Sequence, residues 1–69
     1  MKELFKLTSS EEIGYAEYSA IRCSNGRQVR LSLEEPLEDA KDGEFVDVKV
    51  TAIIGNGAEY EGSLAPDTF

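Results

Sequence analysis

The chain contains no histidine and no tryptophan, and it has a single cysteine, Cys23, among its 69 residues. Histidine is the side chain that most often acts as an acid or base near neutral pH, so its absence argues against most enzymatic chemistry. One cysteine cannot form an internal disulfide, and no Cys-x-x-Cys pair or histidine offers a zinc site. We therefore predict a protein that is not an enzyme, with no cofactor and no metal, in a reducing cytoplasm.

Long apolar runs and positive charge are also scarce. No segment approaches the roughly 20 apolar residues of a membrane span, and the N-terminal stretch lacks the apolar centre of a signal peptide. Seven Lys and Arg stand against fourteen Asp and Glu, which gives a net charge of −7. Such a field repels nucleic acid phosphates and anionic lipid. We expect a protein partner, disfavour nucleic acid, and predict no membrane association.

Alternation of apolar and polar residues predicts short strands within one domain, residues 1–69. The segment 45–54 places its valines on one face, and a second run follows at 58–64. A three-residue loop at 55–57, with Gly57 in the left-handed region, gives the expected register: Ala52 opposite Tyr60, Val50 opposite Gly62 and Val48 opposite Leu64. A glycine opposite Val50 predicts a bend or a close backbone approach.

A second Asn-Gly pair, Asn25-Gly26, predicts another hairpin between the runs 15–23 and 27–33. A two-residue turn places Tyr18 opposite Leu33 and Ala20 opposite Leu31. A three-residue loop would place Glu17 opposite Leu33, so we prefer the two-residue turn, which pairs apolar residues with one another.

The segment 10–21 also fits a helix, because Ser9 and Glu12 form a capping box before residues of helical spacing. Gly14 and two tyrosines favour a strand there. A strand is also expected near the start, in ELFKLT. The acidic connection 34–44 allows a short helical turn at Pro36, and residues 65–69 are expected to fray. The predicted fold is all-β, a single five-stranded antiparallel barrel of SH3-like or OB-like form built around two hairpins, with an α+β fold containing a helix at 10–21 as the alternative.

All three arginines fall in the ten residues RCSNGRQVRL, within the first predicted hairpin. Arginine binds phosphate or carboxylate through two hydrogen bonds, and a basic hairpin with nearby tyrosines is typical of single-stranded nucleic acid binding. The same arginines are also explained as surface residues that pair with acids. The candidate partner-binding residues are Arg22, Arg27, Arg30, Tyr15 and Tyr18.

The stretch PLEDAKDGEFVDVKV resembles the Pro-x-x-Gly-(Asp/Glu)-x-Val-x-Val-x-Val segment of small OB-like barrels of the S1 and TRAM kind, where it leads into a core strand. The resemblance covers about fifteen residues and implies a barrel that binds RNA or nucleoprotein. This chain lacks the exposed aromatic and basic residues that carry such binding.

Three functions are compatible with these features. We predict a non-enzymatic interaction module that binds another protein through an exposed sheet edge or through the arginine hairpin. The alternatives are an OB-like domain for single-stranded nucleic acid, and an acidic mimic of nucleic acid that inhibits a DNA- or RNA-binding protein.

Overall fold

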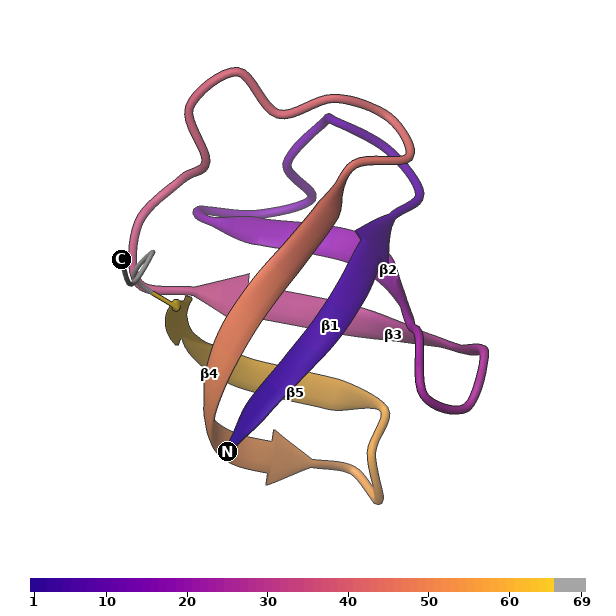
Figure 1. Ribbon diagram of the computed structural model, residues 1–69. Coiled ribbons are helices and arrows are strands. Elements are labelled where there is room, and N and C mark those ends of the chain that lie inside the picture. Colours follow the sequence, from indigo (N-terminus) through magenta and orange to yellow (C-terminus); the bar gives the residue numbers. More distant parts are fainter. Residues whose placement is uncertain (66–69) are drawn as a thin grey trace, which may run out of the picture.

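The computed structural model describes residues 1–65, which form five strands closed into one barrel (Figure 1). The strands are β1 (Lys2–Leu7), β2 (Glu17–Arg22), β3 (Arg27–Leu33), β4 (Phe45–Ile54) and β5 (Glu59–Leu64). They follow one another around the barrel in the order β1-β2-β3-β5-β4, and β4 pairs back onto β1. The predicted all-β barrel of five strands is confirmed. The alternative helix at 10–21 is wrong, because residues 1–65 contain no helix.

One strand pair differs from the antiparallel arrangement that the sequence predicted. Four pairs are antiparallel, whereas β3 and β5 run parallel. The reason is arithmetic: strand directions cannot alternate all the way around a closed ring with an odd number of strands. One parallel pair is therefore required, and it falls where the β4–β5 hairpin meets β3.

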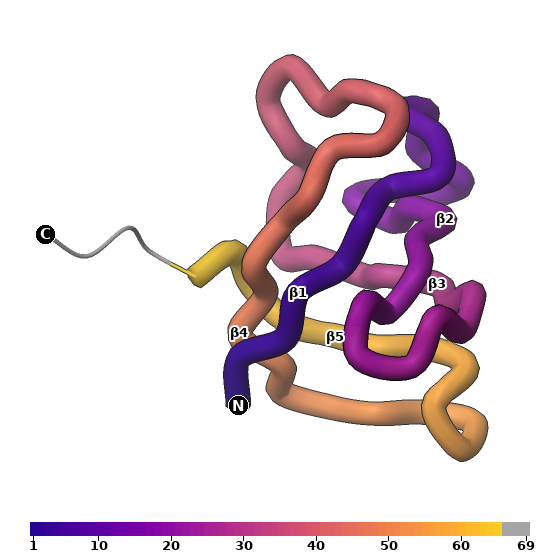
Figure 2. Tube along the Cα trace, turned by 45° about the vertical axis from the view of Figure 1, so that its right-hand side comes forward, coloured from indigo at the N-terminus to yellow at the C-terminus, as the bar shows by residue number. Residues whose placement is uncertain are grey.

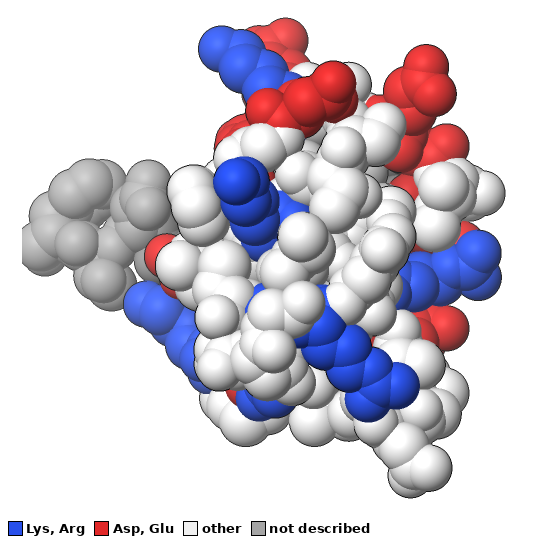
Figure 3. Space-filling model, turned by 90° about the vertical axis from the view of Figure 1, so that its right-hand side faces the viewer, with Lys and Arg blue, Asp and Glu red and all other residues white. Residues whose placement is uncertain are grey.

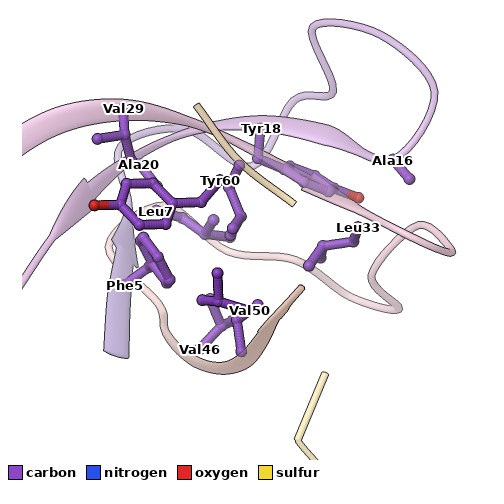
Figure 4. Close-up of a cluster of buried hydrophobic side chains, with 12 residues drawn as sticks. Phe5, Leu7, Ala16, Tyr18, Ala20, Val29, Leu33, Val46, Val50 and Tyr60 are labelled. Atoms are coloured by element: carbon purple, nitrogen blue, oxygen red, sulfur yellow. The ribbon is translucent and has the colours of Figure 1, made fainter. Parts of the chain in front are cut away.

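The interior is filled by the inward-facing residues of all five strands (Figure 4). The rings of Phe5 and Tyr60 meet edge to face, with centroids 5.3 Å apart. Val48 is fully buried on β4, which confirms the predicted inward face of that strand and the core position implied by the OB-like segment. The buried hydrophobic residues are Phe5, Leu7, Ala16, Tyr18, Ala20, Val29, Leu31, Leu33, Val46, Val48, Val50 and Tyr60.

The β4–β5 hairpin follows the predicted register over half of its length. Val50 lies opposite Gly62 and Val48 opposite Leu64, as expected, but a bulge after Val50 moves Ala52 opposite Glu61. The loop consequently has four residues, 55–58, and Gly57 adopts the predicted positive φ, at 89°. A ten-residue strand must bend to stay in so small a barrel, and a bulge supplies that bend.

The β2–β3 hairpin keeps the predicted inward face but not the predicted register. Tyr18 lies opposite Leu31 and Ala20 opposite Val29, a shift of two residues, so the loop is 23–26 and not a two-residue turn. The Gly26 N–H donates to the Arg22 carbonyl at 2.8 Å, and the Asn25 side chain accepts from the Arg27 N–H at 3.0 Å. These bonds satisfy backbone groups of a longer loop, and an even shift leaves the same side chains inside.

The connection 34–44 closes one end of the barrel without forming the helical turn expected at Pro36. Leu37 and Ala40 pack against the core. The Leu37 N–H donates to the hydroxyl of buried Tyr18 at 2.9 Å. Tyr18 therefore combines a core position with the anchoring of this loop.

Tyr18→Phe should lower the free energy of unfolding by about 1–2 kcal/mol, because the half-buried Leu37 N–H loses its acceptor. Urea denaturation followed by circular dichroism measures the change. Tyr15→Phe is the matched control and should be neutral, since Tyr15 is 75% exposed. Equal midpoints for Tyr18→Phe and the unchanged protein would contradict the anchoring role.

The predicted fraying of 65–69 falls mainly on residues 66–69, which lie outside the described residues. Ala65 itself donates its N–H to the Asp47 carbonyl at 3.0 Å. In the described part of the chain, no helix has the length and apolar character needed to cross a membrane.

Candidate functional site

Acidic and basic side chains concentrate at different ends of the barrel. The loops 8–16 and 34–44 share one end, and the Ser10 N–H donates to the Asp42 carboxylate at 2.6 Å between them. These two loops hold eight of the fourteen acids and one base, Lys41. We call this the acidic end. The hairpin loops 23–26 and 55–58 lie together at the opposite end, the hairpin end (Figure 2).

Most basic side chains lie away from the acidic end; the exceptions are Lys41 within it and Lys6, which pairs with Phe45 at its border. Lys2 and Lys49 are directly opposite one another on β1 and β4, and Arg22 and Arg27 are directly opposite on β2 and β3. Like charges placed so cost energy unless other groups compensate. Figure 3 shows most acidic side chains of one face at its top and upper right, together with one basic side chain at the top, and the other basic side chains spread over its middle and lower part among a few acidic ones. The net charge of −7 therefore conceals a basic region.

Arg22 is engaged within the barrel. Its Nη2 donates to Glu3 Oε2 at 2.5 Å, and its guanidinium carbon lies 5.4 Å from the centre of the Tyr60 ring. The hydrogen bond to Glu3 raises the pKa of Arg22. The bond therefore favours the charged form of the guanidinium. Its Nε is buried without a hydrogen-bond partner among residues 1–65, which offsets part of this stabilisation. Arg22 thus covers the hairpin end of the core.

The other two arginines lie in different places. Arg27 is exposed, and its Nη1 donates to the Asn56 carbonyl at 2.8 Å, which links the two hairpin loops. Arg30 faces outward on β3 between Ser19 of β2 and Glu59 of β5. The structure therefore brings Arg22 and Arg27 together at the hairpin end and leaves Arg30 on the outer wall.

The two candidate tyrosines do not join the arginines. Tyr15 is exposed in the loop 8–16 at the acidic end, and Tyr18 is 1% exposed in the core. Neither ring is available beside Arg27 for stacking on a base. The predicted combination of basic and aromatic side chains on one hairpin is not present as a surface.

The three arginines should differ in their effect on stability when each is replaced by alanine. Arg22→Ala should be the most destabilising, because Glu3, with a side chain 11% exposed, would lose its partner. Arg27→Ala should cost less, since it removes one exposed hydrogen bond, and Arg30→Ala should be neutral. Denaturant midpoints measured side by side provide the ranking, and a larger loss for Arg30→Ala than for Arg22→Ala would contradict this assignment.

A groove of about 700 Å³ opens at the acidic end. It lies where β3, β4 and β5 do not extend equally far along the barrel. β4 begins at Phe45, but β5 extends along it only to Leu64, opposite Val48, and β3 ends at Leu33. The connection 34–44 runs over the space that remains. The groove is lined by Leu33, Glu34, Glu35, Pro36, Leu37, Glu38, Glu44, Phe45, Val46, Asp47, Ser63, Leu64 and Ala65.

The groove combines an apolar floor with an acidic rim. The floor consists of Leu33, Val46 and Leu64, of which Leu64 is 49% exposed. The rim carries five carboxylates: Glu34, Glu35, Glu38, Glu44 and Asp47. Among the described residues that line the groove, none is Lys or Arg. An exposed apolar surface bordered by charge is typical of a site that contacts another molecule.

The sequence pattern did not predict this groove. It placed Leu64 inside the barrel, opposite Val48; the pairing is present, but the side chain is half exposed. The available signal was Leu37, an apolar residue within the acidic stretch EEPLED, which indicates that this connection packs on the core.

No known protein family, curated protein or solved structure matches the chain. Within residues 1–65, no group of three or more His, Cys, Asp or Glu side chains is placed to hold a metal ion. The groove and the separation of charge are therefore the features from which a function can be inferred.

Proposed function

We propose that the chain is a non-enzymatic, OB-like module that binds another protein in the groove at the acidic end. The observation that carries the proposal is the pairing of an apolar floor with a rim of five carboxylates in one hollow of about 700 Å³. Apolar contact supplies affinity, and the charged rim selects the partner and steers its approach.

The number of strands supports the OB-like part of this proposal. The barrel has five strands in the order β1-β2-β3-β5-β4 with one parallel pair, and five is the number of strands expected of an OB-like domain. The connection between β3 and β4 carries Leu37 and Ala40 onto the core at the end of the barrel.

The groove is a better binding surface than either surface that the sequence indicated. Every strand has neighbours on both sides, so free edges occur only where one strand extends past another. Arg22 and Arg27 are already bonded to Glu3 and Asn56. Neither a complete sheet edge nor a free arginine cluster supports the interaction.

Capture from a cell lysate tests the proposal. The immobilised protein should retain partner proteins after nuclease treatment, and Leu64→Ser should abolish that retention. Ile54→Ser is the matched control, because Ile54 is exposed to a similar extent, 43%, and does not line the groove. Retention that is unaffected by Leu64→Ser, or equally reduced by Ile54→Ser, would refute binding in the groove.

Binding of single-stranded nucleic acid is a second candidate, favoured by the basic residues around Lys2 and Lys49 and by the Lys6 ammonium, 5.7 Å from the centre of the exposed Phe45 ring. The net charge opposes it, so we expect little oligonucleotide binding at physiological salt. Micromolar, salt-sensitive binding that disappears in the Lys2→Ala, Lys49→Ala double variant would reverse this ranking.

Inhibition of a nucleic-acid-binding protein by mimicry is the third candidate, and the eight acids gathered at one end favour it. A mimic would be displaced from its captured partner by an excess of DNA or RNA. A partner bound in the groove through its apolar floor would not be displaced in this way unless it also binds nucleic acid there.

A further inference from the structure

The groove borders a short length of β4 that, within residues 1–65, has a neighbouring strand on one side only. Phe45 and Val46 pair with Lys6 and Phe5 of β1. On the opposite side, the strand pairing ends at Val48, beyond which the Ala65 N–H bonds to the Asp47 carbonyl. Among residues 1–65, no strand pairs with that side of Phe45 and Val46. Such an edge accepts an added strand through main-chain hydrogen bonds.

The apolar floor lies beside this edge. Val46 and Leu33 are nearly buried and form the base of the groove, whereas Leu64 stands half exposed at its side. Successive side chains of an added strand point alternately into the groove and out of it. One inward side chain of aliphatic character would cover the floor and bury the exposed part of Leu64.

The charge of the rim defines the rest of the ligand. Five of the residues that line the groove carry carboxylates, and none of the described lining residues is Lys or Arg. One cation, Lys6, lies beside the groove, with its ammonium 5.7 Å from the centre of the Phe45 ring, so the surroundings of the groove remain strongly acidic. An acidic or neutral segment would bring no compensating charge to these carboxylates, whereas Lys or Arg at the outward positions would. The C-terminal residues 66–69, PDTF, contain one acid and no base, so the chain's own terminus is a poor match.

Building on the proposed function, we infer that the groove binds an extended, basic segment of another protein, which pairs with the main-chain groups of Phe45 on the β4 edge and places one aliphatic side chain on the Leu33–Val46–Leu64 floor. The main-chain bonds would fix the direction of the segment, and the rim would select its charge.

Fluorescence anisotropy with labelled synthetic peptides tests the inference. The probe is an extended peptide in which Lys alternates with Leu or Val, compared with the same peptide carrying Glu in place of Lys. We expect the Lys peptide to bind more tightly by about tenfold or more at low salt, with the difference shrinking as salt is added. A Lys peptide with alternate backbone nitrogens methylated should lose binding, because it cannot pair with the β4 edge.

Two matched pairs of variants locate the site. Leu64→Ser should weaken binding of the Lys peptide about tenfold through loss of apolar contact, whereas Ile54→Ser should not. Glu35→Lys should weaken it about three- to tenfold, and Glu11→Lys, with the same change in net charge but outside the groove, by less than about twofold.

Equal binding of the Lys and Glu peptides, or equal effects within either pair of variants, would overturn the inference. Tight binding only after Phe69→Ala would also overturn it and identify the chain's own C-terminus as the occupant. If capture from lysate depends on Leu64 while the Lys peptide does not bind, the inference fails and the proposed function stands. If neither depends on Leu64, both fail.

Discussion

Gly62→Ala should unfold much of the protein. A Cβ at residue 62 would lie 2.8 Å from Cγ1 of Val48 and 2.9 Å from the carbonyl carbon of Lys49, and nearer still to the carbonyl oxygen of Lys49. The Lys49 atoms belong to the backbone of β4, so rotation of a side chain cannot relieve the clash. We expect a loss of about 3 kcal/mol or more, which is most of the 3–5 kcal/mol that a core of this size supplies. Thermal and urea denaturation followed by circular dichroism measure it.

Gly26→Ala is the matched control for this experiment. Gly26 has a positive φ of 70°, but a Cβ there meets nothing within 4 Å. The added methyl group therefore costs only backbone strain, about 1 kcal/mol. Equal losses for the two variants would contradict the close approach of β4 to Gly62, since Gly62 itself has no positive φ.

Phe5→Ala should have a comparably large effect. The Phe5 side chain is fully buried and meets the Tyr60 ring edge to face, and Tyr60 in turn lies beneath Arg22. Truncation leaves a cavity and removes an aromatic pair, which together cost about 3–5 kcal/mol. We expect a largely unfolded protein at 37 °C, with loss of the near-ultraviolet circular dichroism signal.

Two further variants keep this prediction testable if Phe5→Ala does not fold. Phe5→Leu preserves most of the volume and should cost about 1.5 kcal/mol, still with a measurable unfolding transition. Leu4→Ala changes the neighbouring residue, which faces outward and is 41% exposed, and should be nearly neutral. An unchanged midpoint for Phe5→Leu would place Phe5 outside the part of the core that limits stability.

The sequence predicted which side chains are buried better than it predicted which residues pair. Val46, Val48 and Val50 alternate with polar residues, and burial of one strand face produces that period directly. Hairpin register depends on loop length, and here it was decided by hydrogen bonds that involve the Asn25 side chain and by a bulge after Val50. Such contacts leave no periodic pattern in the sequence.

The arginines show a similar limit. Three bases within ten residues suggest one patch. In the structure, Arg22 and Arg27 lie two residues beyond buried Ala20 and Val29, on the same face of their strands, whereas Arg30 lies on the outward face. Counting positions along the strand from Val29 would have separated Arg27 from Arg30. The groove could not be found in this way, because it depends on where β5 ends relative to β4 in space.

Separation of charge gives this barrel an electric dipole moment in addition to its net charge. In the field of a positively charged surface, the molecule turns its acidic loops forward before any contact is made. Partners with the groove's preferred charge would meet it already oriented, which increases the fraction of encounters that become complexes. Added salt should therefore slow association much more than it speeds dissociation. When a basic partner approaches the side that carries Lys2 and Lys49, the barrel should rotate before the partner binds.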